Sequence, residues 1–391
     1  MPPSDASPRR EAILLLALAS FNAGISLRCV EAMLPKLAGD FDTSISAASI
    51  IITTFALAYT GAVLVQGPLG DRFGKLRVVT TATALAGVAS LGCATAWDVG
   101  SLAAMRFLTG VFASASVALG MAYIGDVIAL EKRQATIARF ISGSLLGQTL
   151  GPLFGGIFTD WIGWRSSFVV LGMIFIGVAS ILFVRTGRDW PAPAPGRFAP
   201  LEIHRRLLAR REVRWLAAIG VIETFCFFGA YVFLGAYFKL RFDLSFTLIG
   251  LLLAGYGVGG LAYASSAGWL VRRLSQEQLV VAGGLLAGVL FPAVVLAPHW
   301  GYAVPCTIGL GVAFYLIHNT VQTRATEIAP DARGSAVALY ASAWALGQAL
   351  GVGAMGIAVG LFGYAAMISL FGLGFCVLGL WLRTNLWRLR A

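Results

Sequence analysis

The sequence predicts an all-α membrane protein built from twelve transmembrane helices in two related, pseudo-symmetric halves of six. Its composition, the spacing of its apolar stretches and an internal repeat lead to this prediction. Of the 391 residues, 58% are hydrophobic and only 12% are charged, whereas a soluble domain contains about 45–50% apolar and about 25% charged residues. So few charges cannot cover a soluble fold, and apolar side chains this abundant exclude a disordered chain. We therefore expect an integral membrane protein.

Twelve apolar stretches are each long enough to form a helix across a bilayer, which takes about 20 residues. Their continuous apolar character does not fit the alternation of barrel strands. The first stretch is longer than the apolar core of a typical signal peptide, and Arg28, Glu31 and Pro35 occupy positions where a cleavage site would need small residues, so this stretch is expected to be retained. The expected spans are 12–34, 48–67, 78–97, 102–124, 135–158, 168–184, 216–238, 248–270, 279–297, 302–323, 336–361 and 365–382.

The distribution of basic residues predicts the orientation. Twenty-three of the 29 Lys and Arg residues fall on the side of the membrane that holds both termini. Cytoplasmic segments are enriched in these residues, so both termini are predicted to be cytoplasmic, in a bacterial inner membrane. The net charge of +11 then reflects topology and contact with anionic lipid. The six exceptions are Arg28, Lys36, Arg106, Arg165, Lys239 and Arg241.

An internal repeat relates the two halves of the chain. The sequence Leu-Gly-Gln-Thr-Leu-Gly at 146–151 recurs at 346–351 as Leu-Gly-Gln-Ala-Leu-Gly, at an offset of 200 residues. Six spans per half make the repeats parallel, related by an axis along the membrane normal. A segment rich in Pro and Arg separates them and predicts a linker with a short amphipathic helix at about 201–211. The expected domains are residues 1–185, the linker 186–214 and residues 215–391.

The connection between the second and third spans carries the sequence Gly-Pro-Leu-Gly-Asp-Arg-Phe-Gly-Lys-Leu-Arg. Its glycines permit a tight turn, and its charged side chains can form strong hydrogen bonds. The segment resembles the cytoplasmic motif of the major facilitator superfamily, except that Leu76 stands where a second basic residue is usual. The resemblance implies a cytoplasmic gate, to which Asp126 is added because it is expected to pair with the loop arginines. The candidate gate residues are Gly67, Gly70, Asp71, Arg72, Gly74, Lys75, Arg77, Asp126 and Arg133.

The fifth span carries a second motif that is similar to the antiporter motif of this superfamily. Glycines four residues apart make a flat helix face, and the proline beside them loosens the helix. Arg106 begins an Arg-x-x-x-Gly element in span four, which the family links to proton coupling. The resemblance implies kinship with the twelve-span drug:proton antiporters. The residues of the fifth-span motif are Gly147, Gly151, Pro152, Gly155 and Gly156.

Ionisable side chains inside the predicted spans form a further set of candidates, because a charge in lipid is costly and usually functional. Arg28 and Glu31 are three residues apart, so they share a helix face and can pair, and Arg106 could reach Glu31. Glu223 and His318 are each about 12 Å from the cytoplasmic boundary at about 1.5 Å per residue, so they share a depth. A histidine titrates near neutrality, which suits a proton relay.

The family resemblance also implies that spans one, four, seven and ten line a central cavity. Aromatic residues on these spans then suggest a permissive cavity wall: Phe225, Phe227, Phe228, Tyr231, Phe314 and Tyr315. The complete set of candidate proton-coupling and cavity residues is Arg28, Glu31, Arg106, Glu223, His318, Asn22, Phe227, Tyr231 and Asn319.

These features predict a secondary transporter that exports a small amphipathic or hydrophobic molecule by proton antiport and alternating access. Two alternatives stay open: a proton-coupled uptake symporter for a small metabolite, and a non-transporting membrane sensor or partner-binding protein on the same fold. The sequence contains neither a catalytic cluster nor a nucleotide-binding motif, so an enzyme is not expected. Isolated Cys and His residues lack metal-site spacing, and no cofactor is expected. The expected partners are a small-molecule substrate, protons and membrane lipids, without nucleic acid, and the chain is expected to be monomeric.

Overall fold

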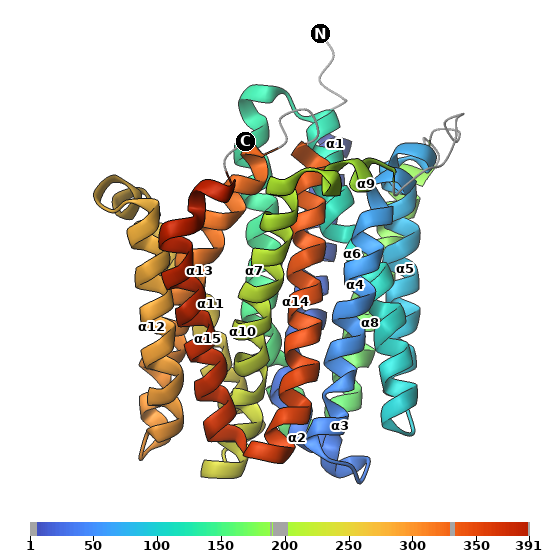
Figure 1. Ribbon diagram of the computed structural model, residues 1–391. Helices are drawn as coiled ribbons and strands as arrows, with labels where there is room; N and C mark the ends of the chain where they lie inside the picture. Colours follow the sequence, from blue (N-terminus) through green and yellow to red (C-terminus); the bar gives the residue numbers. More distant parts are fainter. Residues whose placement is uncertain (1–5, 188–189, 191–201, 329–332, 390–391) are drawn as a thin grey trace.

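A computed structural model describes residues 6–187, 190, 202–328 and 333–389, and the described helices form one bundle (Figure 1). Within these ranges all regular structure is helical, which confirms the predicted all-α class. We call the side on which α1 begins and α15 ends the terminal face, and the side on which α2 and α3 lie the far face (Figure 1).

The first half contains six long helices. Its first span is divided, because α1 (Ala6–Arg28) ends before Cys29 and α2 (Val30–Asp40) continues beyond it. The bond from the Cys29 N–H to the Ile25 carbonyl, at 2.8 Å, keeps the two segments nearly continuous. The other helices are α3 (Ile45–Ala48), α4 (Ile50–Phe73), α5 (Lys75–Ala94), α6 (Val99–Val127), α7 (Leu130–Trp161) and α8 (Trp164–Thr186).

The second half repeats this arrangement with six more long helices. It is preceded by a short helix, α9 (Glu202–Ala209), close to the position predicted for the amphipathic helix. The remaining elements are α10 (Arg211–Phe242), α11 (Phe246–Arg273), α12 (Gln276–Leu296), η2 (Trp300–Tyr302), α13 (Ala303–Glu327), α14 (Arg333–Phe362), α15 (Tyr364–Asn385) and η3 (Leu386–Leu389).

The long helices correspond one to one with the twelve predicted spans. Eleven of the described helical segments are long and apolar enough to cross a membrane. The twelfth long helix, α7, has 32 residues but carries many Gly, Ser and Thr residues, which lower its hydropathy. Its small residues serve helix packing instead, since Gly147 and Gly155 lie directly against backbone carbonyl groups of the first span.

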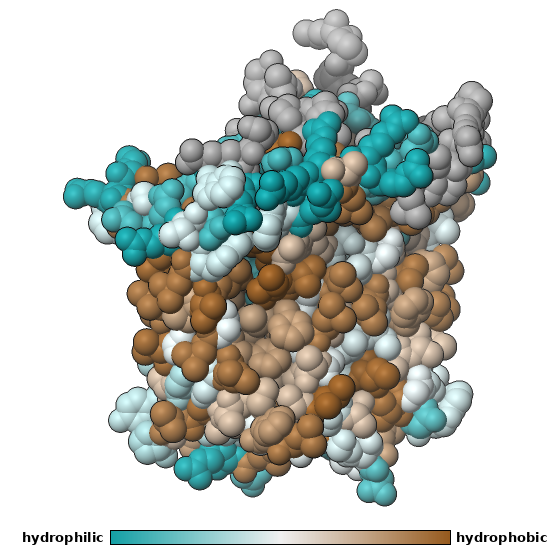
Figure 2. Space-filling model, in the orientation of Figure 1, coloured by the Kyte–Doolittle hydropathy of each residue, from teal (hydrophilic) through white to brown (hydrophobic). Residues whose placement is uncertain are grey.

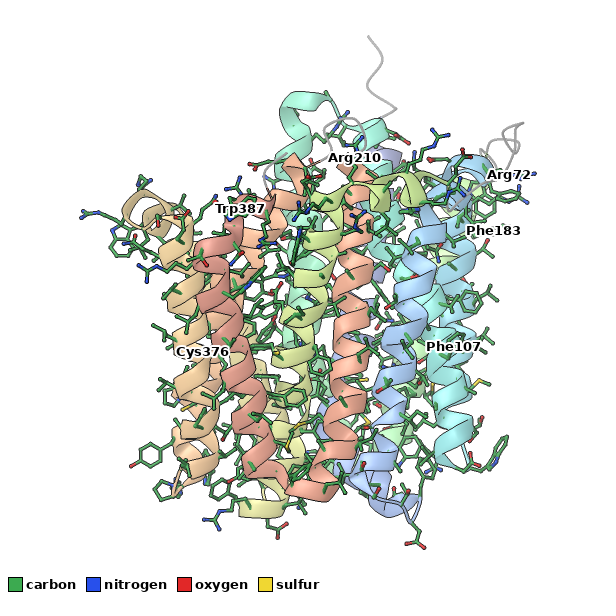
Figure 3. All side chains as sticks on the ribbon, in the orientation of Figure 1. Arg72, Phe107, Phe183, Arg210, Cys376 and Trp387 are labelled. Atoms are coloured by element: carbon green, nitrogen blue, oxygen red, sulfur yellow. The ribbon has the colours of Figure 1, made fainter. Side chains whose placement is uncertain are left out.

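Large apolar side chains cover the outside of the bundle between its two faces. Leu14, Val184 and Ile357 are each at least 70% exposed, and Figure 3 labels Phe107 and Phe183 on the same surface. Figure 2 shows this apolar surface as a brown band between polar ends. An apolar surface of this extent requires lipid rather than water around it, so the exposed side chains agree with the composition.

The internal repeat is visible in the way that equivalent glycines meet equivalent backbone positions. A Cβ at Gly147 would meet the carbonyl of Phe21, and one at Gly347 would meet the carbonyl of Val221. Both residues of the second contact lie 200 positions after those of the first. Because only Gly allows this approach, α7 packs tightly on α1, and α14 packs tightly on α10.

The same two helices also join the halves to each other, since α7 packs on α11 and α14 packs on α4. The predicted linker, residues 186–214, lies partly outside the described ranges, since 188–189 and 191–201 are not described, and the domain boundaries at 185 and 215 stay a prediction.

Candidate functional site

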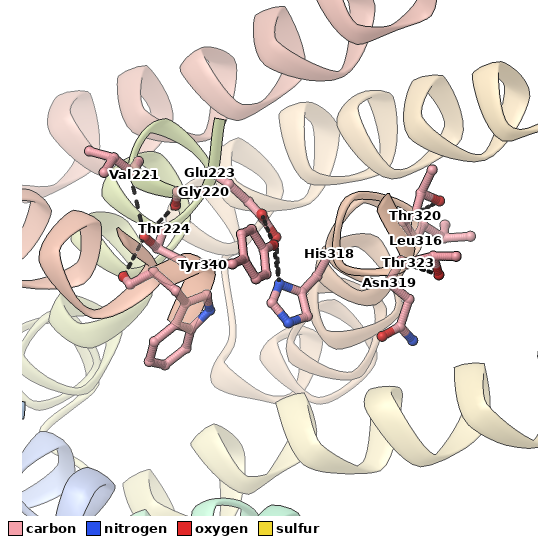
Figure 4. Close-up of polar contacts among 11 residues, drawn as sticks. Gly220, Val221, Glu223, Thr224, Leu316, His318, Asn319, Thr320, Thr323 and Tyr340 are labelled. Atoms are coloured by element: carbon pink, nitrogen blue, oxygen red, sulfur yellow. Dashed lines mark hydrogen bonds and ion pairs between the residues drawn. The ribbon is translucent and has the colours of Figure 1, made fainter. Parts of the chain in front are cut away.

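Glu223, His318 and Tyr340 come together in the second half, from α10, α13 and α14 (Figure 4). Oε1 of Glu223 lies 3.0 Å from Nδ1 of His318, and the Tyr340 hydroxyl donates to Oε2 of Glu223 at 3.0 Å. Glu223 is completely buried, Tyr340 is 2% exposed and His318 is partly exposed. Glu223 and His318 therefore lie at a common depth, as expected, and they are also in direct contact.

This cluster can hold a proton on either of two neighbouring groups. With the proton on His318, both the imidazole and the Tyr340 hydroxyl donate to a charged carboxylate, which stabilises the charge. With the proton on Glu223, the carboxyl group donates to a neutral imidazole. The Tyr340 hydroxyl also lies 3.2 Å from Nδ1 of His318. It therefore stays within hydrogen-bond distance of both groups in either protonation state, without a change in helix positions.

Arg28 and Glu31 form the predicted ion pair, with Nε of Arg28 facing Oε1 of Glu31. Both side chains are buried, at 1% and 0% exposure. Aromatic rings from α10 and α11 enclose the Arg28 guanidinium: Phe228 at 4.9 Å, Tyr256 at 5.2 Å and Tyr231 at 5.6 Å from Cζ to the ring centres. A cation facing aromatic rings in a dry site is well stabilised. The pair thus joins the first half to the second.

Arg106 does not join this pair, contrary to the expectation that it reaches Glu31. Its Nη1 donates to the Ser26 hydroxyl at 3.1 Å, and its guanidinium lies 4.0 Å from the centre of the Phe55 ring. The reason is helix geometry: α6 contacts the face of α1 that carries Ser26, whereas Arg28 and Glu31 lie against α10 and α11. Arg106 is completely buried inside the first half.

The predicted aromatic wall is a closed cluster in this state of the protein. Phe227, Phe228 and Tyr231 are completely buried, and the ring of Phe227 packs on Phe314 at 4.8 Å. The wall prediction is wrong for Phe225, which stacks on Phe371 of α15 at 5.3 Å. Phe314 in turn stacks on His318 at 4.9 Å, so the cluster extends from the Arg28 site to the Glu223 site.

The two predicted asparagines lie apart from both charged sites. Nδ2 of Asn22 donates to the Leu171 carbonyl at 3.0 Å, which joins α1 to α8 within the first half. Asn319 follows His318 on α13, yet its side chain points away from the His318 contact (Figure 4). Adjacent residues on a helix face directions about 100° apart, so His318 and Asn319 cannot both face Glu223.

The predicted gate segment is a tight turn between α4 and α5. Gly74 has φ +89°, a conformation that favours glycine. Lys75 lies 2.6 Å from Asp126 and 3.4 Å from Asp71, so the partner of Asp126 is a lysine rather than the expected arginine. The Asp71 side chain is 72% exposed.

The remaining gate residues surround this ion-pair network. Gly70 lies against Leu119 of α6, whereas Gly67 is open to its surroundings. Nε of Arg133 donates to the Ile128 carbonyl at 3.2 Å. The Arg72 guanidinium lies 5.4 Å from the centre of the Phe73 ring, and Arg77 borders a cleft between α4, α5 and α6.

The fifth-span motif makes a packing surface on two sides of α7. Gly147, Gly151 and Gly155 face the backbone of the first span at Phe21, Ile25 and Cys29. On the other side, Gly156 faces the carbonyl of Phe246, and the carbonyl of Pro152 faces Gly250, both in α11. The flat glycine face that the spacing predicts is therefore present, and it holds α7 between the two halves.

Several polar contacts join the halves near the far face. The Asp160 carboxylate at the end of α7 accepts from the backbone N–H groups of Phe246 and Thr247 at 3.1 and 2.6 Å. The Ser46 hydroxyl donates to the Gly356 carbonyl. Residues 46 and 246 are equivalent in the repeat, so equivalent segments of the two halves each contact the opposite half near this face.

Asp40 lies beyond the first span on the far face, where it contacts Lys36 and the Trp164 indole N–H, the latter at 2.9 Å. Partial burial acts to raise the pKa of the Asp40 carboxyl, but the hydrogen bonds from Lys36 and Trp164 outweigh it and hold the pKa below its usual value.

Sequence reasoning missed Tyr340, Tyr256 and Asp160. Tyr340 and Tyr256 lie in spans eleven and eight, which the family resemblance does not assign to the cavity. Asp160 lies four residues after the last glycine of the fifth-span motif, at the end of a predicted span. A carboxylate at this position could have indicated a polar contact at the membrane surface. Among the described residues, no group of three or more His, Cys, Asp or Glu side chains could hold a metal ion.

Comparison with known proteins agrees with this architecture. Residues 16–352 match the model of the Major Facilitator Superfamily. The chain is 27% identical over 352 residues to the uncharacterized MFS-type transporter YfhI of Bacillus subtilis (strain 168), covering 87% of this chain and 84% of YfhI. It is 27% identical over 176 residues to the efflux pump radE of Floropilus chiversii, covering 44% of this chain and 33% of radE. This chain spans 60% of the length of the first relatives that it matches.

Among solved structures, the chain resembles a bacterial homologue of the human lysosomal transporter Spinster, in an inward-facing and unoccupied conformation. The TM-score is 0.78 at 18% sequence identity, covering 99% of this chain and 97% of that chain. This similarity concerns the fold. Because the family model matches most of the sequence, the chain belongs to the Major Facilitator Superfamily of membrane transporters.

Proposed function

We propose that this transporter exports a small amphipathic or hydrophobic molecule in exchange for protons, by alternating access. The Glu223–His318–Tyr340 cluster carries the proposal. A carboxylate at 0% exposure inside a membrane-spanning helix needs a partner or a proton, and here it has a titratable partner at 3.0 Å. An antiporter needs a site of this kind, because its cycle must carry protons in one direction and substrate in the other.

The aromatic cluster supports the proposed substrate class. Phe227, Phe228 and Phe314 lie between the Arg28 site and His318, and they present mainly apolar ring surface. When the helices move apart, these rings would offer an amphipathic substrate wide apolar contact. The fifth-span motif supports export over uptake, since the family associates it with exporters.

The orientation follows from the charges. The terminal face carries most of the basic residues, so we place it in the cytoplasm of a bacterial inner membrane. The Asp160 and Ser46 contacts close the far face, and this state would therefore face inward. Opening of the far face and closure of the gate at Asp71 would complete the cycle.

A reconstituted system tests the proposal. The purified chain is placed in sealed vesicles, and proton flux is recorded while a panel of small amphipathic fluorophores is added. We expect a pH gradient to drive at least one fluorophore uphill. Glu223→Gln mimics the protonated carboxyl permanently, so it should abolish uphill transport while counterflow of the same fluorophore persists.

Glu327→Gln is the matched control. Glu327 lies at the end of α13, is 55% exposed and pairs with Arg324, so its neutralisation should leave uphill transport intact. If Glu223→Gln still concentrates the fluorophore against its gradient, Glu223 is not the coupling group and the proposal is wrong.

A further inference from the structure

A cleft of about 290 Å³ lies between α4, α5 and α6 in the first half, and these helices run together at the right of Figure 1. Arg77, Thr81 and Leu85 form its wall on α5, at intervals of four residues, and Leu69 and Phe73 form its wall on α4. Residues four apart lie on one helix face. The cleft therefore follows the helices along the membrane normal.

The cleft changes from cationic to apolar along its length. Arg77 lies at the terminal-face end, and Leu85 lies eight residues further into the membrane, which is about 12 Å of helix. Leu85 is 41% exposed, so the cleft opens toward the surrounding lipid. No acidic residue lines the cleft. Its shape and polarity suit an amphiphile with an anionic head and an apolar tail.

The Arg77 guanidinium is available to such a head group. Within the described part of the chain it takes part in no ion pair or side-chain hydrogen bond, whereas its neighbour Lys75 is paired with Asp126 and Asp71. The first turn of α5 begins at Lys75, and its N-terminal backbone N–H groups also favour an anion at this level. The corresponding helix of the second half, α12, begins at Gln276, 201 residues after α5 begins. The position equivalent to Arg77 is therefore Gln278, and the second half does not repeat this charge.

We propose that the cleft binds one anionic phospholipid, with its phosphate group on Arg77 and an acyl chain along Thr81, Leu85 and Leu69. Guanidinium groups bind phosphate oxygens through paired, charge-assisted hydrogen bonds, and an acyl chain fills an apolar cleft that faces lipid. The proposal requires only that the chain spans a membrane, so it is independent of the proposed proton antiport.

Lipid retention by the purified full-length chain tests this proposal. The delipidated protein in detergent is incubated with phosphatidylglycerol or with phosphatidylcholine of the same acyl chains, and bound lipid is counted by native mass spectrometry. We expect one phosphatidylglycerol per chain, retained at least tenfold more strongly than phosphatidylcholine. Equal retention of the two lipids would overturn the proposal.

Two variants separate the head group from the tail. Arg77→Gln should remove the preference for phosphatidylglycerol, and Thr81→Trp, which fills the cleft from an exposed position, should weaken retention of both lipids. Arg383→Gln removes an exposed arginine on the terminal face outside the cleft and should retain phosphatidylglycerol as the parent does. Size-exclusion profiles confirm that each variant is folded.

Three results would contradict the proposal. Arg77→Gln and the parent could retain phosphatidylglycerol equally, or Arg383→Gln could lose retention to the same extent as Arg77→Gln. Glycerol 3-phosphate, added as a soluble competitor at the lipid concentration, could displace the bound lipid, which would show a site for free phosphate esters rather than for lipid.

Discussion

Nδ1 of His318 lies 3.0 Å from Oε1 of Glu223, although 95 residues separate them in the chain. The Tyr340 hydroxyl, from a third helix, bonds the second oxygen of the same carboxylate at 3.0 Å. Three helices of the second half therefore meet at one buried, titratable group. Any movement of α10 against α13 or α14 changes these contacts, so under the proposed antiport mechanism protonation of this cluster would be coupled to helix position.

His318→Gln should strongly reduce uphill transport, because a glutamine side chain can still hydrogen-bond to Glu223 but cannot carry a proton as an imidazole can. Tyr340→Phe removes one hydrogen bond to a charged group, worth about 1.5–3 kcal/mol, so we expect a loss of about 10- to 100-fold in rate. Both are measured as pH-gradient-driven transport in vesicles. His299→Gln, at an exposed position before η2, is the control, and equal rates for all three variants would refute a role for the cluster.

Glu31→Gln should act mainly on stability. The change leaves the buried Arg28 guanidinium without its carboxylate partner, and loss of a buried partner costs about 3–5 kcal/mol. Thermal unfolding of the purified protein measures the effect, and the double variant Arg28→Gln/Glu31→Gln should recover part of the loss. A stable Glu31→Gln protein that lost only uphill transport would instead identify the Arg28–Glu31 pair as the coupling site.

Asp160→Asn should weaken closure of the far face. The carboxylate accepts two backbone N–H groups of α11 across the interface between the halves, and each charged hydrogen bond contributes about 1.5–3 kcal/mol. A balanced two-state equilibrium would shift roughly tenfold or more toward the outward-open state. Distances between spin labels on α7 and α11 report the shift. Asp42→Asn, at an exposed position on the same face, should leave the distribution unchanged.

Asp71→Asn should act on the opposite equilibrium. In the present state Asp71 is 72% exposed and contacts only Lys75 among the ion pairs of the described residues, so its loss costs little here. If Asp71 bridges the halves when the terminal face closes, the variant should disfavour that closed state by roughly tenfold. Distances between labels on the terminal ends of α4 and α14 test this. An unchanged distribution would remove Asp71 from the gate.

Gly147→Ala should destabilise the protein, since a Cβ there would collide with the Phe21 carbonyl of α1. Overpacking typically costs about 1–3 kcal/mol, and Gly347→Ala should cost a similar amount against Val221. Gly61→Ala adds a methyl group to open space and is the control. Thermal unfolding compares the three variants, and an unaltered transition for Gly147→Ala would show that α7 can move away from α1.

The sequence by itself determined that the protein lies in lipid, that it is built from helices and that its two halves are repeats. Low charge and long apolar stretches require lipid and helices whatever the packing, because backbone groups in lipid must bond within their own segment. The equivalence of Gly147 with Gly347 likewise follows from the repeated sequence alone. The i, i+3 spacing of Arg28 and Glu31 also predicts their pairing, because residues three apart lie on one helix face.

The tertiary structure decided which side chains meet across helices. Helix rotation and tilt place Tyr340 on Glu223, turn Arg106 toward Ser26 and away from Glu31, and bury Phe227 in a closed cluster. The spacing of residues along the sequence gives the face that a residue occupies on its own helix. Which helix packs against that face depends on the packing of the whole bundle. For that reason depth could be predicted for Glu223 and His318, while the third member of their cluster could be identified only in three dimensions.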